Sequence, residues 1–259
     1  MPKFAANLTM LFNEHDFLDR FQAAADAGFK GVEYLFPYAY DKQELADRLQ
    51  QHSLTQVLHN LPAGNWDAGE RGIAIFPERV GEFQDGVGRA IDYARALGCK
   101  QVNCLAGKRP ENLSAEKAQQ TLVDNLKFAA EKLHAAGIRL LIEPINNFDI
   151  PGFFIRRTDQ AAQILSEVGS DNLFIQYDIY HAQREEGELA NTIKKFLPQI
   201  AHIQLADNPG RNEPGTGEIN YQWLFKYIDN TGFDGWIGCE YKPASVTKDG
   251  LGWIQALTA

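Results

Sequence analysis

The chain has 259 residues, of which 44% are hydrophobic and 23% are charged, and its formal net charge is −9. Length and composition fit a globular α/β protein that buries a sizeable core. The negative charge disfavours nucleic acid and anionic membranes as partners, because both require a basic face, and no apolar run approaches the roughly 20 residues of a membrane span.

The three cysteines, Cys99, Cys104 and Cys239, have no disulfide-framework spacing, and all lie in apolar stretches. Such cysteines are typical of reduced thiols that are buried as small core residues. The N-terminal segment lacks the apolar core of a signal peptide. We therefore expect a cytoplasmic protein with no membrane partner.

Strand-like and helix-like segments alternate along the whole chain. Strands are predicted near residues 4–9, 31–35, 55–60, 101–105, 139–143, 173–178, 200–205 and 235–240. Helices are predicted near residues 15–27, 41–52, 78–97, 115–136, 158–168, 186–197, 221–231 and 246–257. Eight strand–helix pairs in about 250 residues predict an α/β fold, a single (β/α)8 TIM barrel formed by residues 1–259 as one domain.

Glycines mark the turns that lead into several of these strands. Gly28, Gly98, Gly137 and Gly232 each follow a predicted helix, at the position where a left-handed residue ends a helix. Ser114 is predicted to cap the helix near 115–136. The strands after these turns end in polar side chains, and in TIM barrels that edge carries the chemistry.

Four strands in the second half of the chain end in oxygen-bearing side chains, those of Glu143, Asp178, Gln204 and Glu240. An acid at the end of a buried strand costs free energy unless something pairs with it. Parallel neighbouring strands would bring the four together as a site for Mg²⁺ or Mn²⁺. The alternative is that each is a capping or surface acid just past its strand. Glu33 is predicted to be a bystander that only hydrogen-bonds its neighbours.

Two histidines are predicted to face the same pocket. His59 ends the third strand, and His181 lies three residues after Asp178. His202 shares strand parity with Gln204, so both side chains point to the same side. His202 is therefore a deeper pocket residue, a rival metal ligand or a satisfied core histidine.

Two long connections, at 61–77 and 206–220, follow strands and should lie on the catalytic face. Arg211, in the second connection, would hold a substrate carboxylate through two hydrogen bonds or would be an ordinary solvated arginine. Phe36, Tyr38 and Tyr40 would line the pocket or a contact between subunits, so a homo-oligomer is left open. Four other basic residues are interpreted as scattered surface or loop charge: Arg71, Arg79, Lys108 and Arg109.

Four segments carry a family resemblance. The most specific is HIQLADNPGRNEPGTGEINY at 202–221, and three shorter segments agree with it, IEPIN at 142–146, YDIYH at 177–181 and GCEY at 238–241. With these segments, and over essentially its whole length, the chain resembles the hydroxypyruvate isomerase family of xylose-isomerase-like barrels. It also looks like the closely related 2-oxo-tetronate isomerases, which share the motifs.

The resemblance implies a metal-dependent isomerase. Related ketose 3-epimerases have a histidine where this chain has Gln204, and that difference favours the isomerase branch and a harder metal site. The resemblance also implies roles for individual residues: proton exchange for Glu143 and Glu240, metal binding for these two with Asp178 and Gln204, and substrate contacts for His181 and Arg211.

The leading hypothesis is an intramolecular oxidoreductase acting on a small-molecule oxo acid through an enediolate. It would interconvert hydroxypyruvate with tartronate semialdehyde, or 2-oxo-tetronate with 3-oxo-tetronate. One glutamate would remove a proton and the other would return one, while the metal stabilises the developing charge. The alternative is a ketose 3-epimerase acting on a free sugar. Net charge and the few histidines at strand ends disfavour a DNA endonuclease, and the converging carboxylates disfavour a non-enzymatic binding protein.

Overall fold

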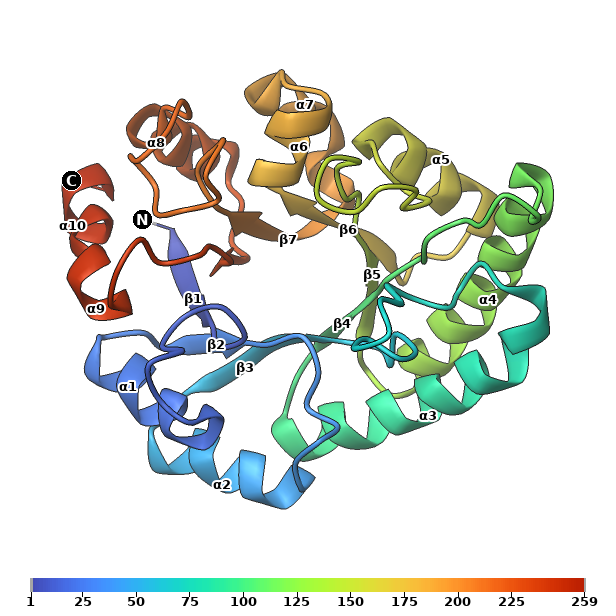
Figure 1. Ribbon diagram of the computed structural model, residues 1–259, viewed down its shortest axis with the longest axis horizontal. Coiled ribbons are helices and arrows are strands. Elements are labelled where there is room, and N and C mark those ends of the chain that lie inside the picture. Colours follow the sequence, from blue (N-terminus) through green and yellow to red (C-terminus); the bar gives the residue numbers. More distant parts are fainter. Residues whose placement is uncertain (1, 259) are drawn as a thin grey trace.

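Eight parallel strands form a closed barrel in the computed structural model, which describes residues 2–258 (Figure 1). Neighbours in the barrel follow chain order from β1 to β8, and β8 pairs with β1. The predicted TIM-barrel fold is therefore confirmed. The strands are β1 (Lys3–Asn7), β2 (Gly31–Glu33), β3 (Thr55–Asn60), β4 (Gln101–Cys104), β5 (Arg139–Ile142), β6 (Leu173–Asp178), β7 (Ile200–Leu205) and β8 (Trp236–Cys239).

Helices surround the barrel (Figure 1), and none among the described residues is long and apolar enough to cross a membrane. Three short 3-10 turns accompany them, at Phe17–Asp19, Pro77–Arg79 and Leu197–Gln199. The helices are α1 (Arg20–Asp26), α2 (Lys42–Gln51), α3 (Val80–Leu97), α4 (Ala115–Ala135), α5 (Thr158–Val168), α6 (Ile179–Glu185), α7 (Leu189–Phe196), α8 (Tyr221–Thr231), α9 (Thr247–Gly250) and α10 (Gly252–Thr258).

The predicted helix near 186–197 corresponds to α7, which begins later, at Leu189, and the helix before it, α6, was not predicted. α6 begins directly after β6, because one oxygen of Asp178 accepts hydrogen bonds from the backbone N–H groups of Tyr180 (2.7 Å) and His181 (3.4 Å). α6 ends before Gly187 and Glu188, which have φ values of 67° and 50°. A right-handed helix cannot continue through left-handed residues, so α7 starts separately.

The predicted helix boundaries at the glycine turns are confirmed. Gly98 and Gly232 have φ values of 64° and 80° and end α3 and α8. The side chain of Ser114 accepts a hydrogen bond from the backbone N–H of Lys117 at 3.2 Å and caps α4. These caps satisfy backbone groups at the ends of the helices that flank the barrel.

The main core lies between the strands and the surrounding helices. The three cysteines are free and buried, as predicted. The barrel interior is tightly filled at β8, because a Cβ on Gly238 would lie 2.3 Å from Glu33 Oε1. Only glycine at this position leaves room for the Glu33 carboxylate inside the barrel.

The strand register brings the polar strand ends to one level. Asp178 pairs with Gln204, and Gln204 pairs with Gly238, so β6, β7 and β8 are aligned at their C-terminal ends. β5 and β8 are shorter than predicted and end one residue before Glu143 and Glu240. Both glutamates therefore emerge just beyond the last strand residue, where the barrel opens.

Candidate active site

Three carboxylates are buried at the C-terminal mouth of the barrel. Glu143, Asp178 and Glu240 are 5%, 2% and 8% exposed. Burial raises the pKa of Glu143 well above its usual range, and the charges of Glu240 and Asp178 raise it further. Burial also raises the pKa of Asp178, and it raises the pKa of Glu240 to about 8 although Arg211 opposes that shift. Acids whose pKa lies near neutrality can give and accept protons at physiological pH.

Arg211 reaches three carboxylates from the loop after β7. Its Nη2 lies 2.8 Å from Glu240 Oε1 and 3.9 Å from Asp178 Oδ2, and its Nη1 lies 3.4 Å from Asp149 Oδ2. The guanidinium also lies over the ring of Tyr180, 5.0 Å from its centroid. Arg211 therefore faces the pocket as predicted, but its charge is already shared among acidic partners.

The side-chain amide of Gln204 joins two layers of acids. Its Nε2 donates to Glu240 Oε2 at 2.6 Å and to Glu33 Oε1 at 2.7 Å. Its Oε1 accepts from Gln176 Nε2 at 2.6 Å. Two carboxylates on one side of the amide fix its orientation, because an oxygen there would be repelled. The oxygen that would bind a metal thus already has a donor.

Glu33 is more than the predicted bystander, because it anchors the layer beneath Gln204. Its Oε2 lies 2.7 Å from His202 Nε2, and its Oε1 also accepts from Asn7 Nδ2 at 3.0 Å. Asn7 reaches Glu240 Oε2 as well, at 3.2 Å. His202 is fully buried against Glu33, deep in the barrel, and its Nδ1 has no hydrogen-bond partner among the described residues. These contacts tie the position of Glu240 to β1, β2 and β7.

His181 is held as a hydrogen-bond donor toward the pocket. Asn146 accepts from the backbone N–H groups of Phe148 and Asp149 through its oxygen, so its Nδ2 faces His181 Nδ1 at 2.5 Å. Burial lowers the pKa of His181 well below its usual value, so the ring is neutral. With Nδ1 accepting, the proton resides on Nε2, which lies 3.7 Å from Asp178 Oδ2.

Three of these groups are close enough together to offer ligand atoms to one cation. Asp178 Oδ2 is buried and has no hydrogen-bond partner among the described residues. Ligand atoms of Glu143, Asp178 and His181 all lie within 4.8 Å of one another. A buried carboxylate oxygen without a donor costs free energy that a bound cation would recover. The hydrogen-bonding pattern of His181 favours the two carboxylates as ligands over the imidazole.

His59 is buried near the end of β3. Its Nδ1 lies 3.2 Å from the Asn60 carbonyl oxygen, and its Nε2 has no partner among the described residues. Burial lowers the pKa of His59 to about 4, so its ring is neutral. Tyr38 packs edge-on against it, with ring centroids 6.0 Å apart. No contact joins His59 to the carboxylates in the described structure.

Several site residues are amides that the sequence reading did not select. Asn103 at the end of β4 donates to Glu143 Oε2 at 3.0 Å, and Asn7 and Gln176 complete the hydrogen bonds of Glu240 and Gln204. The sequence pattern that marks the acids, a polar residue at or near the end of an apolar strand, also marks these amides. Asp149, in the loop after β5, carried no such signal.

The loop after β7 is built around one buried carboxylate. Asp207 accepts hydrogen bonds from the backbone N–H groups of Gly215 (2.8 Å), Gly217 (3.0 Å) and Ile219 (3.1 Å). A Cβ on Gly217 would lie 2.0 Å from the Asn208 carbonyl oxygen. The Gly-Thr-Gly segment at 215–217 therefore closes around Asp207, and this closed loop presents Arg211 to the pocket.

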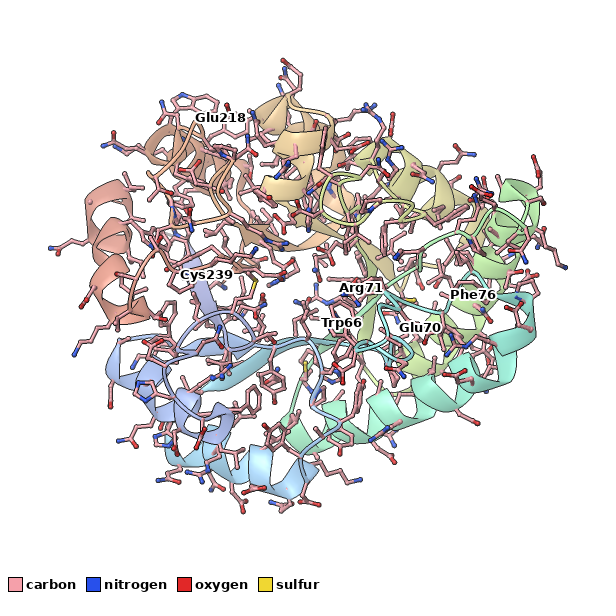
Figure 2. The ribbon with its side chains drawn as sticks, viewed as in Figure 1. Trp66, Glu70, Arg71, Phe76, Glu218 and Cys239 are labelled. Atoms are coloured by element: carbon pink, nitrogen blue, oxygen red, sulfur yellow. The ribbon has the colours of Figure 1, made fainter. Side chains whose placement is uncertain are left out.

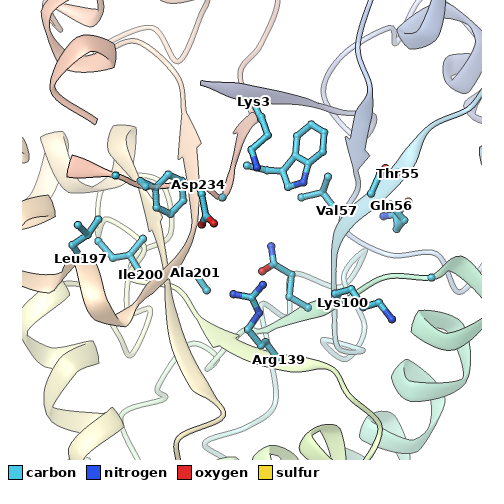
Figure 3. Close-up of a pocket in the computed structure, with 16 residues that line it drawn as sticks. Lys3, Thr55, Gln56, Val57, Lys100, Arg139, Leu197, Ile200, Ala201 and Asp234 are labelled. Atoms are coloured by element: carbon cyan, nitrogen blue, oxygen red, sulfur yellow. The ribbon is translucent and has the colours of Figure 1, made fainter. Parts of the chain in front are cut away.

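Another cavity, of about 430 Å³, lies at the opposite end of the barrel (Figure 3). Residues at strand starts line it, and Lys3, Arg139 and Asp234 point toward its open space. None of the acids at the mouth borders it. In TIM barrels this end contributes to stability, and the chemistry takes place at the other end.

Comparison with known proteins agrees with the geometry. A family described as xylose isomerase-like TIM barrel matches residues 21–257. Hydroxypyruvate isomerase of Escherichia coli (strain K12) is 58% identical over 98% of this chain and 99% of its own length. A 2-oxo-tetronate isomerase of Cupriavidus necator is 48% identical over 98% of each chain.

Solved structures give the same fold. A Brucella melitensis structure titled AP endonuclease, family 2 is 44% identical, with a TM-score of 0.97 over 99% of both chains. A solved L-ribulose 3-epimerase has a TM-score of 0.77 at 21% identity over 100% of this chain and 88% of its own, a level at which only the fold is shared.

Proposed function

Because the chain belongs to the xylose isomerase-like TIM barrel family and is an isomerase, we propose that it interconverts hydroxypyruvate and tartronate semialdehyde. Two of its relatives are named hydroxypyruvate isomerase and 2-oxo-tetronate isomerase, and both names specify a short hydroxy-oxo acid as the substrate. The observation that carries the proposal is the pair of buried glutamates, Glu143 and Glu240, both with a raised pKa and both at the barrel mouth.

The reaction moves one hydrogen between adjacent carbons. One glutamate removes a proton from C3 of hydroxypyruvate, the electron pair moves toward the C2 carbonyl, and an enediolate forms. The other glutamate delivers a proton to C2, and the proton of the C3 hydroxyl passes to the oxygen on C2, so that C3 becomes the aldehyde and C2 carries the hydroxyl. A carboxylate on each side of the planar enediolate suits this exchange, since each works as an acid in one direction and as a base in the other.

Other residues hold the substrate and the charge. The Nε2–H of His181 would donate to a substrate oxygen, and Arg211 would stabilise negative charge next to Glu240. Gln204 and Asn103 hold Glu240 and Glu143 in place. Fixed donors of this kind lower the barrier because they need no reorganisation when charge develops.

A divalent metal, Mg²⁺ or Mn²⁺, is part of the proposal. Glu143 and Asp178 would hold it, with Glu240 as a third carboxylate. Gln204 would join them only after its oxygen is released by Gln176. When bound, such a cation draws electron density from adjacent carbonyl and hydroxyl oxygens. Asp178 Oδ2 supports this part of the proposal, because it is buried and has no hydrogen-bond donor among the described residues.

Two other substrates are kept as alternatives. The 2-oxo-tetronate/3-oxo-tetronate pair differs by one carbon and uses the same chemistry. A ketose 3-epimerase would exchange a proton at a single carbon of a free sugar, so a sugar assay separates it from the isomerase. The net charge of −9 gives no support to an activity on DNA.

Proton NMR of hydroxypyruvate in D₂O tests the proposal. The protein would be measured with added Mg²⁺ or Mn²⁺ and again with EDTA. Metal-dependent formation of tartronate semialdehyde with solvent deuterium on carbon is the expected result. If the folded, metal-treated protein produces none, hydroxypyruvate is excluded as a substrate, and 2-oxo-tetronate and then free ketoses are the next to be assayed.

A further inference from the structure

Basic residues interpreted from the sequence as scattered charge gather on the catalytic face. Arg71, Lys108 and Arg109 line one cleft of about 320 Å³ between the loops that follow β3, β4 and β5. Arg79 is instead paired with Glu70, with 2.5 Å between Nη1 and Oε1, and with Glu82 at 2.8 Å. Arg71, Lys108 and Arg109 are loop charges as predicted, but they are gathered in one cleft and not scattered.

Arg71 is held in one orientation by uncharged groups. Its guanidinium stacks on the Trp66 ring, 3.9 Å from the centroid, and its Nη1 donates to the carbonyl oxygens of Trp66 (2.9 Å) and Glu70 (2.7 Å). Trp66 in turn packs against Phe36, with ring centroids 5.0 Å apart. Arg71 forms no ion pair within residues 2–258. A half-buried, oriented guanidinium without an acidic partner is prepared to bind an anion.

The position of Arg71 relates it to the acids at the mouth. The next residue, Gly72, pairs with Ala106, two residues after β4. β4 also supplies Asn103, whose amide donates to Glu143. In Figure 2, Arg71 and Trp66 lie beside the open centre of the barrel, on the side of β4 and β5. The loop after β3 thus places Arg71 on the same side of the barrel as Asn103, which holds Glu143.

Arg211 is the less available of the two arginines. It already shares its charge with Glu240, Asp178 and Asp149. A substrate carboxylate placed on Arg211 would meet these three carboxylates and be repelled by them. A substrate carboxylate bound to Arg71 would not be repelled in this way, because Arg71 has no acidic partner among the described residues. The neighbouring acid, Glu70, is neutralised by its ion pair with Arg79.

We propose that Arg71 binds the carboxylate of the substrate and thereby selects oxo acids over free sugars. The inference rests on the proposed function, because it assigns one end of that substrate. Arg211 then stays paired with Glu240 and stabilises negative charge near the reacting carbons. The stack on Trp66 presents the remaining N–H groups of Arg71 to the ligand, so binding costs little side-chain entropy.

The test compares Arg71→Gln and Arg71→Lys with the matched variant Arg89→Gln. Arg89 also lies over an aromatic ring, 4.8 Å from the Tyr38 centroid, and donates to the Tyr38 carbonyl oxygen at 2.9 Å, but from the exposed face of α3. Kinetics are measured with hydroxypyruvate and with dihydroxyacetone, in which a hydroxymethyl group replaces the carboxylate. Binding of tartronate, an unreactive dicarboxylate, is measured by calorimetry.

For Arg71→Gln we expect the KM for hydroxypyruvate to rise about 10- to 100-fold with a much smaller change in kcat, since a hydrogen-bonded charge is lost. The preference for hydroxypyruvate over dihydroxyacetone should fall by a similar factor. Arg71→Lys should recover part of the loss, and Arg89→Gln should behave like the unchanged protein.

The tartronate measurement separates the two proposals. If the protein converts no oxo acid but loses tartronate affinity in Arg71→Gln, the proposed reaction is wrong and the anion site stands. Equal tartronate affinity in Arg71→Gln and the unchanged protein, or no tartronate binding in either, overturns the role of Arg71.

Discussion

At the scale of single residues, the site places several carboxylates where water is excluded. Glu33, Glu143, Asp178 and Glu240 are all buried, and Arg211 is the cation that contacts two of them. Like charges in a low-dielectric pocket raise each other's pKa, so the pocket holds protons that isolated acids would release. This is the physical basis for assigning proton transfer to Glu143 and Glu240.

Glu143→Gln and Glu240→Gln should each lower turnover of hydroxypyruvate by about 100-fold or more, the usual size of a general acid–base contribution. The amide keeps the shape of the side chain but cannot exchange the proton. Circular dichroism and a thermal melt serve as controls for folding. Substantial residual turnover in both variants would contradict the two-base scheme.

Glu33→Gln should shift the pH profile of the reaction without touching the substrate. The charge of Glu33 raises the pKa of Glu240. Removing that charge lowers the pKa of Glu240, so the limb of the kcat profile that reports Glu240 should move to lower pH. Steady-state rates from pH 5 to 10 measure the shift. Because Gly238 leaves space for a side chain of this size, Glu33→Gln should remain folded. An unchanged profile would argue against electrostatic coupling between Glu33 and Glu240.

The sequence was sufficient to locate the acids but not their amide partners. Glu143, Asp178 and Glu240 stand out because an acid after an apolar run is unusual. Gln176 does not stand out in the sequence. Its contact with Gln204 depends on a register shift between Ile175 and Gln176, and no sequence pattern marks that shift. The roles of the predicted metal and substrate residues stay predictions.

At the scale of elements, the loop after β7 is a folded unit and not a flexible connection. Its backbone N–H groups converge on Asp207, and its backbone also pairs with the next loop, where Lys242 N donates to the Arg211 carbonyl oxygen at 2.7 Å. Arg211 itself has a φ of 56°, a left-handed conformation that the surrounding contacts must hold in place.

Gly217→Ala should loosen this loop and lower kcat/KM. The added methyl group would lie 2.0 Å from the Asn208 carbonyl oxygen and 2.7 Å from Asp207 Oδ1, so the backbone must shift. Gly88→Ala is the matched control, because a Cβ there meets nothing within 4 Å and alanine is the better helix former. We expect faster proteolysis within 206–220 for Gly217→Ala only. Equal protection in both variants would show that the loop tolerates the methyl group.

Element boundaries show where sequence periodicity fails. The helix predicted near 186–197 begins only at Leu189, because the residues just before it, Gly187 and Glu188, are left-handed. The last predicted helix is two helices, α9 and α10. Glycine turns before strands were predictable because each is local to a few residues. The start of α6 depends on the Asp178 side chain folding back on its own backbone, which apolar periodicity does not report.

At the scale of the whole molecule, the buried acids link stability to pH. The folded-state pKa of Glu240, about 8, is above its ordinary value of 4.5, and that of Glu143 is also raised. Below pH 4.5 both acids are protonated in either state, and their contribution to folding stability is fully present. It is lost as pH rises through the folded pKa, because the folded protein must then hold buried charges.

In EDTA, the melting temperature should therefore fall between pH 6 and pH 9. Glu240→Gln should flatten that decline, since it removes one titrating group from the pocket. Differential scanning fluorimetry of both proteins across this range makes the measurement. An identical slope in the two proteins would show that Glu240 does not titrate in this window.

Mn²⁺ or Mg²⁺ should raise the melting temperature most at the alkaline end of the same range, where the carboxylates are ionised. A ligand that binds only the folded state stabilises it by about 2.7 kcal/mol at 100 times its dissociation constant. Glu143→Gln should reduce the metal-induced rise. A rise that is equal in the variant, or absent in both, would argue against a metal site at Glu143.

Asp178 uses its two oxygens for unrelated tasks. One starts α6 by accepting from the backbone of Tyr180, and the other faces the pocket, 3.9 Å from Arg211 Nη2 and without a hydrogen-bond donor among the described residues. Such a position is constrained twice during evolution, because asparagine preserves the helix start and changes only the pocket, whereas alanine destroys both. A descendant of this barrel that adopts a different chemistry would therefore be expected to retain asparagine or aspartate here, as a trace of the earlier site.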